Sequence, residues 1–191
     1  PGMLECAFVR SPHPHAVIRS INSGPAVKLP GVHAVFSYAD LAPLFIKNFI
    51  PPDNPALEFA ETTKAIVLAE DEVCYVGEIV AIVVADTRYI AEDALALVDV
   101  DYEILPAISD CRDAIAPDAA RAHRHASNNI VAEFRTEYGD CDTAFSNAFH
   151  ILNLSLKQHR GSGHPIEGRG IVIEFDSTND GLTAWSSTQG A

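Results

Sequence analysis

The longest apolar run in the chain reads Ile79-Val80-Ala81-Ile82-Val83-Val84-Ala85. Five of these seven residues are β-branched, and an unbroken run of this length is typical of a strand that is buried on both faces. The run falls far short of the roughly 20 apolar residues that a membrane-spanning helix needs. The sequence therefore predicts a buried central strand and no membrane span.

A helix is expected directly after this strand. Asp86 or Thr87 can act as its N-cap, because both side chains can accept a hydrogen bond from a backbone N–H of the first turn. Residues Val98–Ile104 then alternate between apolar and acidic or polar side chains, as in a strand with one solvated face. We therefore expect a strand–helix–strand unit over residues 79–104, with parallel strands and a right-handed crossover. The apolar positions of the helix follow helical spacing: Ile90, Ala91, Ala94, Leu95 and Leu97.

Shorter elements precede this unit. Leu4–Val9 and Ala16–Asn22 are predicted as strands that pair with each other across the turn at residues 11–15, in which two prolines remove backbone donors. Three further elements are expected before residue 50, namely a helical turn at Gly24–Leu29, a strand at Val32–Ser37 and a short helix at Tyr38–Pro43.

The second half of the chain has a different composition. Residues 108–129 are rich in Ala, Pro, Asp and His, which indicates a linker. The pattern ends just after a strand, without a closing element, and we expect further chain to follow. The elements predicted beyond the linker are a strand at Ile130–Tyr138, a capped helix at Asp140–Ala148, a strand at Phe149–Gln158 and a hairpin of Ile171–Phe175 with Leu182–Ser186.

Composition and charge exclude some classes of function. The 191 residues carry a formal net charge of −13, and the 13 Lys and Arg residues are scattered. Nucleic-acid binding needs clustered cations, so no nucleic-acid partner is expected. The residues Pro1–Glu5 lack the basic and apolar regions of a signal peptide. The four cysteines form no Cys-x-x-Cys pair, which favours reduced thiols in a cytoplasmic protein; they are Cys6, Cys74, Cys111 and Cys141.

Two pairs of histidines occur at a spacing of two residues, His13 with His15 and His123 with His125. Neither pair has a third ligand nearby in the sequence, and neither has the i, i+4 spacing of a helical zinc motif. We therefore interpret them as solvated loop histidines and predict no metal ligand.

A glycine-lined polar segment extends from residue 159 to residue 170. Its glycines let the backbone approach another group closely, and Arg160 can hold an anion, although an ordinary surface loop is the alternative. Gly161-Ser162-Gly163 is not the Gly-x-Ser-x-Gly of a hydrolase nucleophile, and no phosphate-binding Gly-Lys-Ser/Thr follows it. Glu167 and Arg169 are expected to pair with each other or with backbone groups of a neighbouring subunit, and a structural ion pair is favoured over an acid–base role.

The residues Trp185–Ala191 contain a run of small hydroxyl side chains that leads to Gln189. A side-chain amide at a strand end can donate one hydrogen bond and accept another, as an oxygen of a buried cofactor would require. On chemistry alone the segment is equally a polar strand terminus. The residues by themselves thus indicate a two-zone α+β chain with one polar, glycine-lined corner.

Several segments, taken in order, resemble the large subunit of the molybdenum hydroxylases, a group that includes xanthine dehydrogenase, aldehyde oxidase and aerobic carbon monoxide dehydrogenase. The similarity covers almost the whole chain. It depends on several short segments that occur in the same order as in the family, and no single motif decides it. The similar segments are Phe8–Ala16, Leu29–Val32, Ala39–Leu41, Val73–Ala81, Ala91–Ala94, Val100–Ala107, Gly139–Asp142 and Trp185–Gln189.

The resemblance implies an α+β fold in three parts. An α/β hammerhead domain (residues 1–107) would be joined by a linker (108–129) to the beginning of the molybdopterin-binding domain (130–191). In this family the glutamine of the Ser-Thr-Gln segment hydrogen-bonds an oxygen at the molybdenum centre, and Gln189 occupies that position. Near the active-site cavity the family has a Pro-Met-Glu-Pro-Arg-like stretch, and this chain has the different sequence His-Pro-Ile-Glu-Gly-Arg in its place. The candidate cavity-lining residues of this segment are His164, Glu167 and Arg169.

The resemblance also implies cofactors and partners. The full subunit would carry molybdenum–molybdopterin and would hydroxylate an N-heterocycle or an aldehyde, or oxidise carbon monoxide, with water as the oxygen source. Electrons would pass to [2Fe–2S] clusters and FAD on an iron–sulfur subunit and an FAD subunit, in a dimer of heterotrimers.

The family's catalytic residues lie elsewhere in the subunit. Its Gly-Gly-Phe-Gly loop and its catalytic glutamate are absent from these 191 residues, so no catalytic residue is expected here. We expect the isolated chain to be inactive and to bind no molybdopterin. The alternatives are a non-catalytic assembly module with the same fold, and an unrelated hydrolase or metal-binding protein.

Overall fold

The computed structural model describes residues 2–50, 66–159, 161 and 166–188. The chain divides into two compact units, Pro1–Glu137 and Tyr138–Ala191. Within the described residues, no helix is both long enough and apolar enough to cross a membrane.

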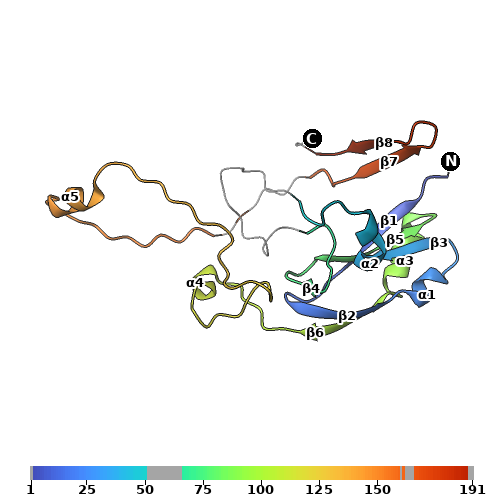
Figure 1. The fold of residues 1–191 in the computed structure, drawn as a ribbon, viewed down its shortest axis with the longest axis horizontal. Coiled ribbons are helices and arrows are strands. Elements are labelled where there is room, and N and C mark those ends of the chain that lie inside the picture. Colours follow the sequence, from blue (N-terminus) through green and yellow to red (C-terminus); the bar gives the residue numbers. More distant parts are fainter. Residues whose placement is uncertain (1, 51–65, 160, 162–165, 189–191) are drawn as a thin grey trace. The chain divides into compact units, whose positions relative to one another are not determined.

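The first unit is built on two antiparallel sheets of three strands each (Figure 1). The first sheet has the order β1-β5-β3, with β1 at Glu5–Arg10, β5 at Ile79–Ala85 and β3 at Val32–Ser37. The second sheet has the order β4-β2-β6, with β4 at Glu72–Val73, β2 at Ala16–Asn22 and β6 at Asp99–Ile104.

The predicted buried strand is β5, the centre of the first sheet. Ala81, Val83 and Ala85 belong to one hydrophobic cluster, whereas Val80 belongs to a second cluster with Val73. Both faces of β5 are therefore covered near its beginning, as its unbroken apolar sequence indicates. Removal of this apolar surface from water is the dominant stabilising contribution in a fold of this kind.

The predicted parallel pairing of β5 with β6 is wrong. Both edges of β5 are already paired, with β1 on one side and β3 on the other, so no edge remains for β6. β6 instead pairs in antiparallel register with β2 in the second sheet. Its alternation fits this place, because Val100 and Tyr102 are half-buried while the acidic residues that alternate with them are exposed.

The predicted pairing of the first two strands with each other is also wrong. The Ser11 N–H donates to the Glu78 carbonyl (2.9 Å), and the Gly77 N–H donates to the Ser11 carbonyl (2.8 Å). These bonds continue the pairing of β1 with β5 up to the turn. The proline-containing segment that follows lacks two backbone donors, and beyond it the chain enters the other sheet as β2.

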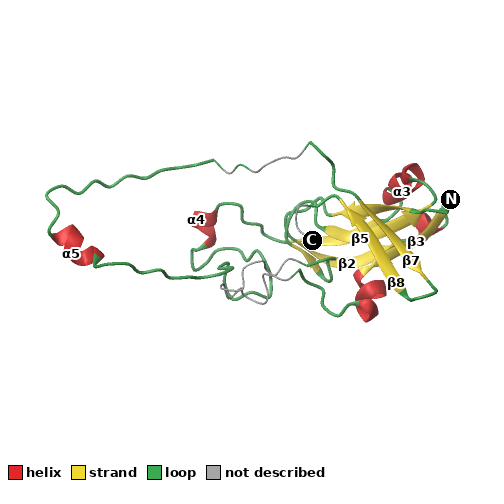
Figure 2. Ribbon diagram, turned by 90° about the horizontal axis from the view of Figure 1, so that it is seen from above, coloured by secondary structure: helices red, strands yellow, loops and turns green. Residues whose placement is uncertain are grey.

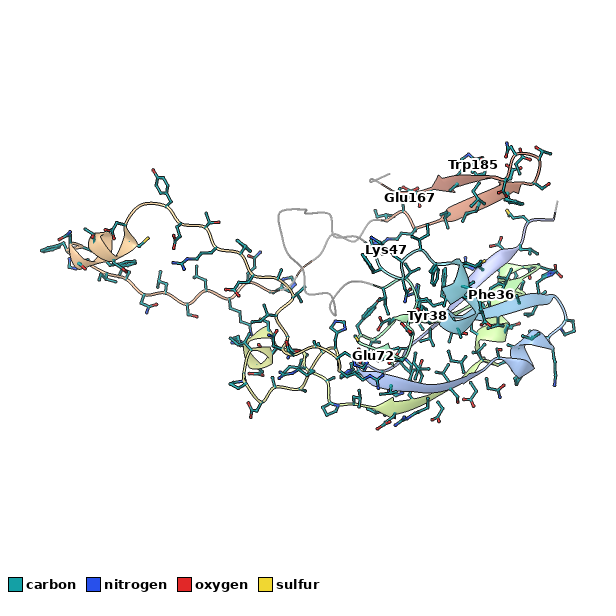
Figure 3. The ribbon with its side chains drawn as sticks, in the orientation of Figure 1. Phe36, Tyr38, Lys47, Glu72, Glu167 and Trp185 are labelled. Carbon is teal, nitrogen blue, oxygen red and sulfur yellow. The ribbon has the colours of Figure 1, made fainter. Side chains whose placement is uncertain are left out.

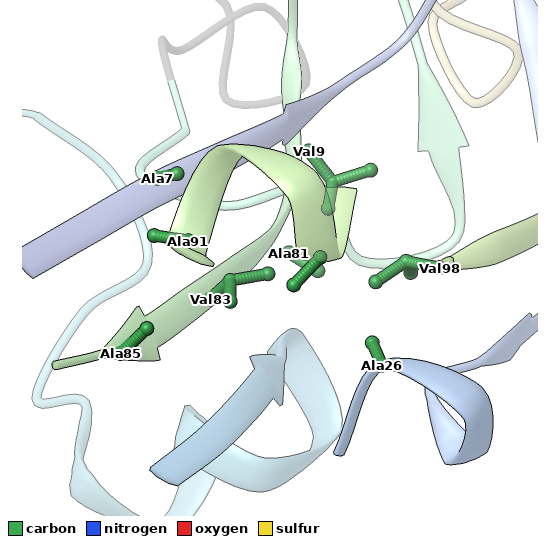
Figure 4. Packing of buried hydrophobic residues seen from close by; sticks show 9 residues of the cluster. Ala7, Val9, Ala26, Ala81, Val83, Ala85, Ala91 and Val98 are labelled. Carbon is green, nitrogen blue, oxygen red and sulfur yellow. The ribbon is translucent and has the colours of Figure 1, made fainter. Parts of the chain in front are cut away.

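The helix after β5 is α3, Arg88–Leu95, and Thr87 is its N-cap, because the threonine side chain accepts a hydrogen bond from the Ile90 N–H. Ala91 and Ala94 are fully buried in the same hydrophobic cluster as the inward-facing residues of the first sheet. Figure 4 shows Ala91 in this cluster. Small residues at these two positions let the helix lie close to β1 and β5. The predicted helix and its cap are confirmed.

The turn before β3 requires a glycine. Gly31 has a φ of +87°, a backbone conformation that other residues rarely adopt. A Cβ at this position would also lie 2.8 Å from Cδ1 of Ile90. The remaining helices of the first unit are short: α1 at Gly24–Val27, α2 at Tyr38–Leu41, the 3-10 turn η1 at Ala42–Leu44 and α4 at Cys111–Ala114.

The residues predicted as a linker are folded onto themselves. They contain α4, which the Asp110 side chain caps by accepting a hydrogen bond from the Arg112 N–H. The Asn129 amide donates to the carbonyls of Ala114 (3.0 Å) and Ala120 (2.8 Å) and accepts from the Ala122 N–H (2.8 Å). One asparagine thus closes a loop of the connecting segment, residues 107–129.

The second unit contains α5 (Cys141–Ser146), capped by Asp140, and the hairpin of β7 (Ile171–Asp176) with β8 (Gly181–Ser186) (Figure 2). The helix and the hairpin confirm two predictions. The strands predicted at Ile130–Tyr138 and Phe149–Gln158 are not formed, apart from one bridge residue at 132. Their alternating apolar side chains are exposed, since no neighbouring strand in the described residues pairs with them.

Replacement of Ala91 by leucine is expected to lower the free energy of unfolding by about 1–3 kcal/mol, because the larger side chain has no room between α3 and the sheet. Chemical denaturation followed by circular dichroism measures the effect. Tyr89→Ala on the same helix is the control, with a change within about 0.5 kcal/mol, since Tyr89 is 79% exposed. Equal unfolding midpoints for the two variants would contradict this packing.

Candidate functional site

The β7–β8 hairpin brings two polar segments of the sequence together. Ile171, the first residue of β7, lies opposite Ser186, the last residue of β8. Residues 166–170 therefore lie beside residues 187–188, and we call these two stretches the polar corner. Glu167 and Trp185 are labelled on its two sides in Figure 3.

Ser187 holds the polar corner together. Its backbone N–H donates to the Gly170 carbonyl (3.0 Å), and its Oγ accepts a hydrogen bond from the Gly170 N–H (2.8 Å). The same hydroxyl lies 3.3 Å from the carbonyls of Gly168 and Gly170 and can donate to either. One residue thereby anchors the segment before β7 on the chain that leaves β8 toward Gln189.

The structure describes two of the four predicted site residues, Glu167 and Arg169. Glu167 and Arg169 lie in the polar corner and are exposed. The ion pair expected between them is not formed, and at exposed positions water competes with such pairing. His164 and Gln189 lie outside the described residues, so their roles remain predictions.

The glycines of the polar corner leave one of its sides open. A Cβ built at Gly168 or at Gly170 would meet no atom within 4 Å. Another group can therefore come close to the backbone here, with the Arg169 guanidinium available as a donor to an anion. This chemistry suits a polar, negatively charged ligand or a further protein segment.

A second cluster of polar side chains lies in the first unit, and it corrects the interpretation of the histidines. His15 is buried, with 4% of its surface exposed, and its Nδ1 lies 2.8 Å from the Pro106 carbonyl. His123 is half-buried, and its Nδ1 lies 3.2 Å from Sγ of Cys74. His13 packs edge-on against the ring of Tyr102. These three are therefore not solvated loop residues, whereas His125 is exposed, as the sequence predicts.

The electrostatics of this cluster are those of a buried, acidic site. Burial raises the pKa of the Cys74 thiol well above its usual range, and the nearby carboxylates of Glu72 and Glu78 raise it further. Burial lowers the pKa of His123, which favours its neutral imidazole. Burial also raises the pKa of Glu78, although its carboxylate accepts a hydrogen bond from the Cys74 N–H (2.5 Å).

The sequence carries only a partial signal for this cluster. Glu72 and Cys74 are two residues apart in an extended segment, which places both on one face (Glu72 is labelled in Figure 3). His123 follows 49 residues after Cys74, and nothing in its local sequence indicates the contact.

Comparison with known proteins assigns both parts of the chain. Residues 1–106 match the family described as "Aldehyde oxidase and xanthine dehydrogenase, a/b hammerhead domain". The chain belongs to this molybdenum hydroxylase family. Residues 122–191 match the molybdopterin cofactor-binding domain, so the α+β fold of a hammerhead domain followed by the start of a molybdopterin-binding domain is confirmed.

Its relatives are large subunits. The chain is 38% identical over 188 residues to the nicotine 6-hydroxylase large subunit of Paenarthrobacter nicotinovorans, with 98% of the chain and 22% of that protein aligned. It is also 38% identical to the carbon monoxide dehydrogenase large chain of Afipia carboxidovorans, with 99% of the chain and 24% of that protein aligned. This hydroxylase family member therefore spans about a quarter of the length of these relatives.

The fold agrees with a solved structure of the family. Quinoline 2-oxidoreductase from Pseudomonas putida 86 matches with a TM-score of 0.83 and 36% identity, over 98% of this chain and 23% of that one. The division of the hydroxylase chain at residues 107 and 130 stays a prediction, as do the roles of the four site residues.

The Gly170 amide is expected to exchange with solvent about 2- to 10-fold faster in Ser187→Ala, because the variant loses the hydroxyl that accepts its hydrogen bond. Hydrogen exchange followed by NMR measures the rate. In Thr183→Ala, which alters an exposed residue of β8, the rate should match that of the parent protein. An unchanged Gly170 rate in Ser187→Ala would show that Ser187 does not hold the corner.

In protein dialysed against a chelator, Cys74 is expected to react with iodoacetamide at pH 8 at least about tenfold more slowly than the exposed Cys111. The raised pKa of Cys74 leaves little of the reactive thiolate. Timed quenching followed by peptide mass spectrometry gives both rates from one sample. Similar rates for the two cysteines would contradict the buried environment of Cys74.

Proposed function

We propose that this chain forms the hammerhead domain and the first part of the cofactor-binding domain in the molybdenum-cofactor subunit of an oxidoreductase. The observation that carries the proposal is the polar corner, where Ser187 ties the segment of Glu167 and Arg169 to the chain that leads to Gln189. Membership of the molybdenum hydroxylase family supports the chemistry assigned to it.

The residues of the polar corner are suited to a molybdopterin cofactor. Gly168 and Gly170 allow close approach to the backbone, and Arg169 supplies a cation for an anionic group. Gln189 follows two residues after Ser187 and would offer its amide to an oxygen at the molybdenum centre. His164 and Glu167 would line the same cavity.

Each part of the corner has a separate task in this proposal. Ser187 is a positioning residue, because its hydrogen bonds set the path of the chain before Gln189. The Gln189 amide would orient the cofactor by one donated hydrogen bond, and Arg169 would hold it by charge. When bound, the molybdenum cofactor supplies two-electron oxidation chemistry with water as the oxygen source.

The substrate class we propose is an N-heterocycle or carbon monoxide, with an aldehyde as the alternative. Support comes from relatives named for nicotine, quinoline and carbon monoxide. The words "large subunit" and "large chain" in two of those names also support assembly with other subunits. We propose that these are an iron–sulfur subunit with [2Fe–2S] clusters and an FAD subunit, in a cytoplasmic dimer of heterotrimers.

The full-length protein, purified with its partner subunits, is expected to contain one molybdenum per large subunit by elemental analysis. It should reduce an artificial electron acceptor with carbon monoxide, with nicotine or quinoline, or with benzaldehyde. Molybdenum at background level would overturn the proposal and favour a non-catalytic assembly module. Molybdenum without turnover of any of these substrates would overturn the substrate class.

The contact assigned to Gln189 is tested by Gln189→Ala in the same enzyme. Loss of one hydrogen-bond donor at the reacting centre is expected to lower kcat by about 10²- to 10³-fold with the molybdenum content unchanged. Thr183→Ala, on the exposed surface of β8, is the matched control and should keep the parent kcat. Equal kcat values for the two variants would remove Gln189 from the site.

A further inference from the structure

Three potential metal ligands from distant parts of the sequence converge in the first unit. Ligand atoms of Glu72, Cys74 and His123 all lie within 4.8 Å of one another. The sulfur of Cys74 and Nδ1 of His123 are 3.2 Å apart. All three side chains are half-buried, so an ion from solvent can reach them. No other such group of three occurs in the part of the chain that the structure describes.

A buried histidine lies beside this group, although it is not one of the three side chains whose ligand atoms all lie within 4.8 Å of one another. His15 is buried, and its Nδ1 donates to the Pro106 carbonyl, because a carbonyl oxygen can only accept. This bond leaves Nε2 as the free ring nitrogen, and Nε2 has no hydrogen-bond partner. It lies 3.6 Å from Oε2 of Glu72. A buried nitrogen lone pair thus points toward a carboxylate oxygen that is itself an acceptor.

A cation beside these two acceptors would satisfy both of them. The distance of 3.6 Å between Nε2 and Oε2 is slightly longer than the ligand–ligand distance of a tetrahedral zinc site, about 3.3–3.5 Å for a nitrogen and an oxygen ligand with bonds of about 2.0–2.2 Å. The bond from Nδ1 to a carbonyl is also the usual way in which a metal-binding histidine is oriented.

The charges around the cluster favour a divalent cation. Two carboxylates surround Cys74: a ligand oxygen of Glu72 lies within 4.8 Å of its sulfur, and Glu78 accepts a hydrogen bond from its N–H. Arg124 pairs with Asp71 at the rim. Its backbone N–H donates to Oε2 of Glu72 (3.1 Å), and its guanidinium Nε lies 3.8 Å from the same oxygen, so this one cation is shared between two carboxylates. A bound dication would compensate the carboxylate and would let Cys74 bind as a thiolate, with its proton released to solvent.

We propose that this cluster binds one Zn²⁺ ion through the side chains of Glu72, Cys74 and His123, with Nε2 of His15 or a water molecule as the fourth ligand. Sulfur, imidazole and carboxylate ligands together are typical of zinc. Cys74 and His123 come from the two parts of the chain that match different domains. The ion would therefore clamp the connecting segment onto the hammerhead domain, beside the ion pairs of Arg124.

Zinc content tests the proposal directly. The full-length protein is dialysed against a chelator, then incubated with Zn²⁺ alone, desalted and measured by elemental analysis. One zinc ion per chain is expected to bind to the parent protein, and Cys74→Ser and His123→Gln should each return the content to background. The controls Cys111→Ser and His125→Gln, which change residues outside the cluster, should keep one ion.

Two measurements on the parent protein do not depend on the folding of any variant. X-ray absorption at the zinc edge should show one sulfur at about 2.3 Å and three nitrogen or oxygen neighbours at about 2.0–2.2 Å. Added Zn²⁺ should also protect Cys74, but not Cys111, from iodoacetamide. The proposal is overturned if the parent protein binds no zinc, if the absorption spectrum shows no sulfur neighbour, or if folded Cys74→Ser retains the ion.

Discussion

Burial of β5 on both faces and along both edges is the constraint on which the first unit depends. The strand contributes Val80 to one hydrophobic cluster and Ala81, Val83 and Ala85 to the other. Its two edges pair with β1 and β3. Unpaired backbone groups in such a place would be costly, so both neighbours are required. Every other strand of the unit is arranged around this saturated centre. In particular, β6 must find its partner elsewhere, and β2 supplies it.

The same constraint positions polar groups at the beginning of β5. Glu78, directly before the strand, is buried and accepts the Cys74 N–H, which holds the turn between β4 and β5. Cys74 and Glu72 are thereby brought against His15, which follows the end of β1 and its proline turn. The connecting segment adds His123 from the other side. A cluster with metal-binding chemistry thus results from the way in which three connections meet at one end of the core.

The second unit depends on a smaller interaction. The β7–β8 register places the residues before and after the hairpin side by side, and Ser187 fixes them with a backbone and a side-chain hydrogen bond to Gly170. An isolated two-stranded hairpin with exposed apolar side chains is only marginally stable in water. The exposed Trp185, Val172 and Ile173 are therefore suited to contact with a further protein segment.

Local features of the structure were open to prediction from local patterns. The seven-residue apolar run, the Thr87 cap, the small residues of α3 and the β7–β8 hairpin each depend on residues within one element or one turn. The partner of β6 was not predictable in this way. The alternation of apolar and polar residues in Val98–Ile104 is compatible with antiparallel as well as with parallel pairing. The extended sequence at Phe149–Gln158 has strand periodicity but finds no partner among the described residues, so it stays unpaired.

By itself, the sequence determined the strand β5, the helices α3 and α5 and the β7–β8 hairpin, as well as the α+β class and, through its ordered segments, the molybdenum hydroxylase family. Only the tertiary structure decided that β5 and β6 belong to different sheets, that Ser187 anchors Gly170, and that His15 and His123 meet Glu72 and Cys74. The physical reason is the range of the interactions. Caps and periodicity act over a few residues, whereas competition for strand edges and the burial of polar groups act between residues that are tens of positions apart.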